Sequence, residues 1–171
     1  MQDHIVYLAN SSGLKVGITR ATQVPTRWVD QGATQALPII RVRNRFQSGA
    51  LEVLFKQYVS DKTNWRDMLK GVATPLDLNL KATEILNKFS SEVDEIKERY
   101  NPFGVSILNG IEMVDISYPV TRYPDKITSY NFDKEKIIED KLLGIKGQYL
   151  IFEEGVINLR KFSGYEVELH H

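Results

Sequence analysis

Cysteine is absent from this chain of 171 residues, and histidine occurs only three times. The lack of cysteine excludes disulfide bonds and thiolate zinc sites within the chain, and it fits a reducing compartment. Two of the three histidines, His170 and His171, end the chain and resemble the start of a purification tag, so they are left out of the functional interpretation. A histidine-rich metal site is therefore not expected.

Long apolar runs and a net charge are missing as well. No stretch approaches the ~20 apolar residues of a membrane span, and no charged-then-apolar leader opens the sequence. The hydrophobic content of 42% and the charged content of 26% are ordinary for a globular protein, which at this length can hold one large core or two small ones. We expect a soluble, cytoplasmic protein without a membrane partner. The oligomeric state stays open.

The net charge of zero hides an uneven distribution. Residues 1–60 carry seven basic and three acidic side chains, which makes +4 there and −4 in the remainder. Because basic patches attract phosphate backbones through counterion release, Arg41, Arg43 and Arg45 are candidate substrate-binding residues. The alternative is that these arginines are only the solvent face of a strand, since Val42 and Phe46 interleave with them at a period of about two.

Periodicity and turn residues predict an α+β first half. The expected elements are strands over residues 4–9, 14–19 and 36–46 and helices over residues 24–32, 48–60 and 75–100. Pro25 and Pro75 suit the first turn of a helix, Gly32 suits a helix end, and Ser48 can cap a helix. These elements favour a small three-stranded antiparallel sheet flanked by helices.

Beyond a break at residues 101–104, the pattern changes from helical to alternating. Five short segments with turn signals predict a small antiparallel β-barrel or curled sheet, over residues 112–120, 126–132, 137–145, 148–152 and 156–169. Their aromatic residues either form a core or stack single-stranded nucleic acid, and residues 144–149 are the best local candidate for a ligand-facing loop. We therefore predict two domains, residues 1–105 and 111–169.

Four polar residues of the first half are of the types that phosphodiester cleavage needs. Tyr7 and Lys15 lie on the predicted hairpin, where a rigid backbone can aim a hydroxyl and an ammonium at one point. Arg27 offers a fork of donors for phosphate oxygens, and Glu52 can hold a divalent cation. The alternative is that Glu52 is a surface carboxylate on an amphipathic helix and that Tyr7 and Lys15 are merely strand residues.

The order of these residues resembles the GIY-YIG endonuclease superfamily over about residues 1–70. Ile5-Val6-Tyr7 occupies the first strand motif of that superfamily, and Lys15-Val16-Gly17 occupies the second. Arg27 falls where the superfamily has its catalytic arginine, and Glu52 matches its metal-binding glutamate. The resemblance implies a GIY-YIG-like fold that uses Mg²⁺ or Mn²⁺ and acts on DNA or RNA.

The resemblance also implies substrate contacts at the edge of the site. The chain departs from the superfamily at one position within the site, Lys15. Gln31 stands where some relatives place a histidine, and Asn64 matches a late asparagine of the superfamily. The superfamily usually has tyrosine at the position of Lys15. Either Tyr7 takes the role of base, while Lys15 holds phosphate, or the site binds nucleic acid without cutting it.

The run from Tyr7 to Arg20 is similar to that of a bacterial domain-of-unknown-function family, and this likeness extends over the whole chain. Members of that family carry a Cys-rich segment before this point, which implies that the chain is part of a longer protein. Three functions follow from the sequence: a metal-dependent endonuclease, a non-catalytic nucleic-acid-binding module, or a protein-interaction domain.

Overall fold

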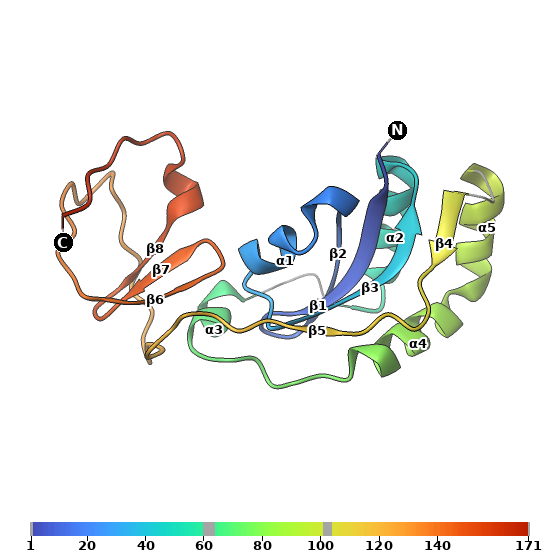
Figure 1. Cartoon of the computed structure of the whole chain (residues 1–171), viewed down its shortest axis with the longest axis horizontal. Coiled ribbons are helices and arrows are strands. Elements are labelled where there is room, and N and C mark those ends of the chain that lie inside the picture. Colours follow the sequence, from blue (N-terminus) through green and yellow to red (C-terminus); the bar gives the residue numbers. More distant parts are fainter. Residues whose placement is uncertain (1, 60–63, 101–103, 171) are drawn as a thin grey trace.

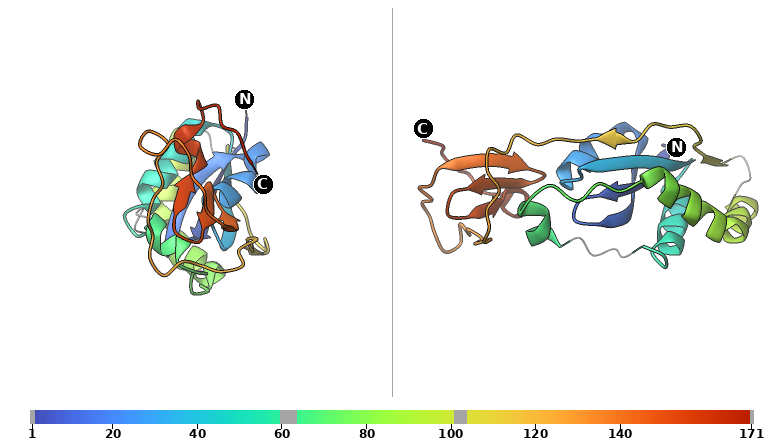
Figure 2. Two further views of the ribbon diagram at one scale, coloured as in Figure 1. Left: turned by 90° about the vertical axis from the view of Figure 1, so that its left-hand side faces the viewer. Right: turned by 90° about the horizontal axis from the view of Figure 1, so that it is seen from below.

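The computed structural model describes residues 2–59, 64–100 and 104–170. Within them, five strands form one antiparallel sheet and three strands form a second, so the fold is α+β as predicted (Figure 1). The two sheets lie side by side along the long axis of an elongated molecule, with helix α3 (Trp65–Leu69) between them (Figure 2).

The first sheet is built on the predicted hairpin. Its strands are β1 (His4–Asn10), β2 (Leu14–Arg20), β3 (Gln35–Val42), β4 (Val105–Ile107) and β5 (Val114–Asp115). The strand order is β2-β1-β3-β4, and β5 pairs with β3 near its other end. Tyr7 faces Gly17 across β1 and β2, so the hairpin is confirmed. The first sheet therefore begins at residue 4 and is completed by β4 and β5, which come after the helices in the sequence.

Every residue of β1 is buried, because helices cover both faces of the first sheet. On one face Val6 and Leu8 join a core with side chains of α2 (Arg45–Phe55), α4 (Leu78–Lys88) and α5 (Ser90–Tyr100). On the other face Ile5, Tyr7 and Ala9 pack with Trp28 of α1 (Thr26–Asp30), which follows a short 3-10 helix over Ala21–Gln23. The alternation of strand side chains thus sends Tyr7 to the α1 face.

The third strand and the helix after it differ from the prediction. The strand ends at Val42 rather than at residue 46, and the helix begins at Arg45 rather than at residue 48. Asn44 is the N-cap, and its side chain accepts a hydrogen bond of 2.9 Å from the Gln47 N–H. Ser48 instead is buried and donates its hydroxyl to the Arg45 carbonyl. Asparagine is as good a cap as serine, so the two positions could not be separated by residue type.

The predicted long helix over residues 75–100 is two helices. Asp77, not Pro75, is the N-cap of α4 and accepts from the Leu80 N–H; the helix ends at Lys88, with Phe89 as its C-cap, before α5 begins at Ser90. The ring of Phe89 is buried against Phe55, with ring centroids 6.0 Å apart. No helix in the part of the chain that the structure describes is long and apolar enough to cross a membrane.

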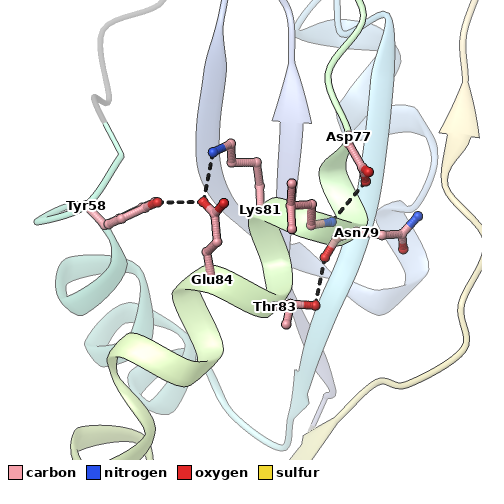
Figure 3. Close-up of polar contacts among 7 residues, drawn as sticks. Tyr58, Asp77, Asn79, Lys81, Thr83 and Glu84 are labelled. Carbon is pink, nitrogen blue, oxygen red and sulfur yellow. Dashed lines mark hydrogen bonds and ion pairs between the residues drawn. The ribbon is translucent and has the colours of Figure 1, made fainter.

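A polar cluster on the surface ties α4 to the end of α2. Glu84 accepts a hydrogen bond of 2.7 Å from the Tyr58 hydroxyl and forms an ion pair of 2.8 Å with Lys81 (Figure 3). These contacts lower the pKa of Glu84, with the Lys81 hydrogen bond as the largest cause. Tyr58 thereby holds the segment after α2 against α4.

The second sheet is smaller than predicted and is not a barrel. It has three antiparallel strands in the order β6-β7-β8, over Leu142–Lys146, Tyr149–Phe152 and Val156–Asn158. The predicted strand over residues 126–132 is not formed. Its only pairing with the second sheet among the described residues is the isolated bridge between Ser129 and Val156. The alternation was misleading because several of its apolar residues face solvent: Ile137, Val167 and Leu169 are 84%, 60% and 90% exposed.

Lys146 ties the second sheet to α3. Its side chain is fully buried, and its amino group donates to the carbonyls of Met68 (2.8 Å) and Gly71 (2.7 Å) beside α3. The rings of Tyr118 and Tyr123 lie 5.7 and 5.1 Å from the same nitrogen. Burial lowers the pKa of Lys146 to about 8, because the carbonyls and rings do not fully replace the solvation of an ammonium group.

The buried Lys146 predicts a stability that rises with pH. Since its pKa falls from 10.5 in the unfolded chain to about 8 in the folded chain, the unfolded state binds more protons between these values. The free energy of unfolding should therefore increase by about 2 kcal/mol between pH 8 and pH 10. Lys146→Met should remove most of this slope. Urea titrations at several pH values measure it, and an equal slope in both proteins would contradict the role of Lys146.

Candidate functional site

A polar hollow of about 360 Å³ opens where β2, α1 and α2 meet. Eight residues line it: Lys15, Val16, Gly17, Ile18, Arg27, Gln31, Arg45 and Glu52. Five of them are residues that the sequence singled out for function, although they span 38 positions and lie on three elements. The hollow is the natural candidate for a functional site.

The position of β2 explains why both helices reach the hollow. β2 is the edge strand of the first sheet, so α1 on one face and α2 on the other can both extend past it. Arg27 and Gln31 are four residues apart at α1, whereas Arg45 and Glu52 are seven apart on α2. Both spacings place the two side chains on one side of their helix.

Tyr7 lies behind the hollow rather than within it. Its side chain is fully buried, and its ring lies so close to Gly17 that a Cβ there would come within 2.6 Å of the ring. Its hydroxyl donates a hydrogen bond of 2.8 Å to the Gln31 side chain, which does line the hollow. The expectation that Tyr7 points into the same concave surface as Lys15 and Glu52 is therefore corrected: Tyr7 reaches it through Gln31.

The hydroxyl of Tyr7 stays protonated at neutral pH. Burial raises its pKa to about 12, although the positive charge of Arg27 and hydrogen bonds to Arg27 and Gln31 oppose the shift. The negative charge of Glu52 raises the pKa further. Tyr7 is consequently a hydrogen-bond donor at neutral pH and not a ready base.

Glu52 is the single acidic residue of a lining that also holds Lys15, Arg27 and Arg45. Its carboxylate lies 3.6 Å from the Lys56 amino group, one helical turn further along α2. Lys56 was not identified as a site residue from the sequence, although its i,i+4 spacing from Glu52 was a visible signal. The described residues contain no group of three or more His, Cys, Asp or Glu side chains that could hold a metal by themselves. Among the residues that the structure describes, Glu52 is the one carboxylate in the lining that a cation could use.

Three predicted substrate-binding residues lie outside the lining of the hollow. Arg41 is exposed on β3, opposite Ser106 of β4, and Arg43 is exposed in the loop before α2. Asn64 does not reach the edge of the site as expected. It caps α3 by accepting from the Arg66 N–H, and its amide donates to Asp67. An asparagine at this place in the sequence can be either a substrate-binding residue or a helix cap, and Asn64 is a helix cap.

Tyr118, in the segment between β5 and β6, and the turn after β6 fix the end of α1 that carries Gln31. The hydroxyl of Tyr118 lies 3.1 and 2.9 Å from the carbonyls of Val29 and Ala33. Gly147, at the turn between β6 and β7 with φ +60°, lies so close that a Cβ would come within 2.9 Å of the Asp30 carbonyl. Residues 144–149, the expected ligand-facing loop, thus include a turn that packs against α1.

The chain belongs to the family described as Protein of unknown function (DUF2797), whose model matches residues 1–167. The matched residues contain both sheets, so the second sheet belongs to the region that the family shares. No curated protein and no solved structure matches the chain. None of these comparisons supports membership of the GIY-YIG superfamily.

The contact between Tyr7 and Gly17 predicts that one added methyl group at position 17 lowers the stability of the fold. Gly17→Ala places a Cβ within 2.6 Å of the Tyr7 ring, which must move and lose its bond to Gln31. We expect a loss of about 1–3 kcal/mol in the free energy of unfolding. Gly49→Ala on α2 is the matched control, because nothing lies within 4 Å of its Cβ, and it should be neutral or stabilising. Equal urea midpoints for the two variants would contradict this packing.

Proposed function

We propose that this DUF2797 protein binds nucleic acid and hydrolyses phosphodiester bonds at the hollow, with the help of a divalent cation. The observation that carries the proposal is the convergence of Lys15, Arg27, Arg45 and Glu52 on one hollow from three elements. A carboxylate among three basic side chains suits a phosphate site that uses a divalent cation, because the carboxylate can hold the cation and the basic groups can hold phosphate.

The basic side chains supply the affinity for phosphate. Arg27 and Arg45 present planar donor groups that can each bind two phosphate oxygens, and Lys15 adds a compact positive charge from β2. Lys15 is only 8% exposed, so β2 sets where its charge lies. A phosphate bound between α1 and α2 would therefore meet positive charge from more than one side.

Glu52 fits the way in which magnesium is commonly held by proteins. Mg²⁺ and Mn²⁺ prefer oxygen ligands, and Mg²⁺ is often bound through one or two carboxylates together with substrate phosphates and water. The Glu52 side chain is 22% exposed at the hollow, so it is accessible to such a cation. When bound, the cation would polarise the phosphoryl oxygens and neutralise developing charge.

The remaining residues position the reacting groups. Hydrolysis forms a bond from a water oxygen to phosphorus and breaks the bond from phosphorus to the leaving oxygen. The water loses one proton to solvent and the leaving oxygen gains one from solvent, so the step balances. Gln31 would accept from or donate to the attacking water, and the Tyr7 hydroxyl fixes the orientation of its amide. Arg27 would stabilise charge on the phosphoryl oxygens.

A relationship to the GIY-YIG superfamily is part of this proposal. It is supported by the order of Tyr7, Gly17, Arg27 and Glu52 in the sequence and by the pairing of Tyr7 with Gly17. The hollow that gathers Gly17, Arg27 and Glu52 supports it as well. Lys15 at the usual tyrosine position remains the main difference.

Binding without cleavage is the second candidate function. It is favoured by the protonated Tyr7, which cannot act as a base at neutral pH, and by the ion pair between Glu52 and Lys56. In that case Glu52 would serve only to orient Lys56. Activity measurements on two variants separate these functions.

We expect purified protein to cleave at least one of labelled single-stranded DNA, duplex DNA or RNA, and only with Mg²⁺ or Mn²⁺. Glu52→Gln should reduce cleavage by about 100-fold or more while sparing binding, because it removes the cation ligand but no phosphate donor. Arg27→Ala should weaken binding itself by about 10-fold or more, because it removes charge-assisted hydrogen bonds.

Two exposed residues away from the hollow provide the controls. Glu95→Gln on α5 and Arg122→Ala, which loses an ion pair to Glu153, should leave cleavage and binding unchanged. Cleavage that persists in Glu52→Gln or without a cation would overturn the role of Glu52. Salt-sensitive binding without any product would assign the binding function instead.

A further inference from the structure

An aromatic pair lies on the surface at the N-terminal end of α2, the helix that also supplies Arg45 to the hollow. Phe46 directly follows Arg45 and is 66% exposed. Its ring makes an edge contact with Tyr100 at the end of α5, with centroids 5.0 Å apart and ring planes at 70°. The Phe46 ring of this pair is thus available to solvent on the helix that carries Arg45 and Glu52.

A buried glutamine holds this pair rigidly. The Gln47 side chain is 1% exposed, donates to the Tyr100 carbonyl (3.2 Å) and accepts from the Arg43 N–H (3.2 Å). The space for it depends on Gly104, where a Cβ would come within 2.7 Å of the Gln47 amide. One side chain therefore fixes the loop before α2, the first turn of α2 and the end of α5 relative to one another.

The surroundings of Phe46 on the side of the loop are positive. Arg41, Arg43 and Arg45 are all exposed, and within the described ranges none of them forms an ion pair with a carboxylate. On α5, exposed Arg99 lies with its guanidinium carbon 5.4 Å from the centroid of the Tyr100 ring, while the acidic side chains of Glu95 and Glu98 are also exposed. Arg99 therefore adds positive charge at the aromatic pair, and a polyanion can follow the arginines there.

We propose that Phe46 is a stacking site for a nucleobase of single-stranded DNA or RNA whose phosphate occupies the hollow. This inference rests on the proposed function and names its substrate as a single strand. Arg45 lines the hollow and Phe46 is the next residue of α2. Consecutive helix residues project about 100° apart, so a strand with a phosphate in the hollow would cross the N-terminal end of α2 to place its next base on the Phe46 ring. A base within a duplex is already stacked and cannot use the Phe46 ring.

Binding of fluorescent oligonucleotides, measured by anisotropy without a divalent cation, tests this site. Because loss of a stacked base costs about 5- to 100-fold in affinity, Phe46→Ala should weaken single-strand binding by that factor. Phe46→Tyr keeps the ring and should bind within about twofold of the natural protein. Val53→Ala is the matched control, since Val53 is also 66% exposed on α2 but offers no ring. Blunt duplex DNA should bind all four proteins alike.

The outcomes separate the stacking site from the function on which it rests. Weaker single-strand binding by Phe46→Ala alone, with unchanged duplex binding, supports the stacking site. If Arg27→Ala weakens binding while Phe46→Ala does not, the stacking site is wrong and the hollow still binds phosphate. If neither variant weakens binding, both are wrong. Equal urea midpoints for Phe46→Ala and the natural protein ensure that the comparison concerns folded chains.

Discussion

The burial of β1 on both faces is the constraint from which the candidate site follows. Because every residue of β1 is covered, its alternate side chains must belong to two different cores. α2 packs in one core and α1 packs in the other. The edge strand β2 lies between the two helices and lines the hollow. The two helices could not both present charged residues there if one face of β1 were exposed to solvent, as strands of antiparallel sheets often are.

The hairpin and the charged residues of the hollow were predictable because they depend on local order. Tyr7 and Gly17 face one another through strand register, and Arg27 and Glu52 follow from where two helices begin. Residue type did not distinguish Asn44 from Ser48 as a cap. The placement of Tyr7 behind Gly17 was not predictable, since it depends on how closely two strands and α1 pack.

The second half was harder to predict because its sequence pattern and its burial disagree. Val167 and Leu169 alternate with polar residues as a strand would, yet they are exposed. The short β5 pairs with a strand nearly 80 positions earlier, which no local pattern indicates. The role of Lys146 was also invisible, because its partners are carbonyls of Met68 and Gly71 that carry no sequence signal.

The late arrival of β4 and β5 has a consequence for how the chain folds during synthesis. β1, β2 and β3 can pair as soon as residue 42 has left the ribosome, but the outer edge of β3 stays open until residues 105–115 follow. The end of α1 must wait for Tyr118 and Gly147. Open edges are where chains associate wrongly, so this protein is most exposed to misassembly while its middle third is being made.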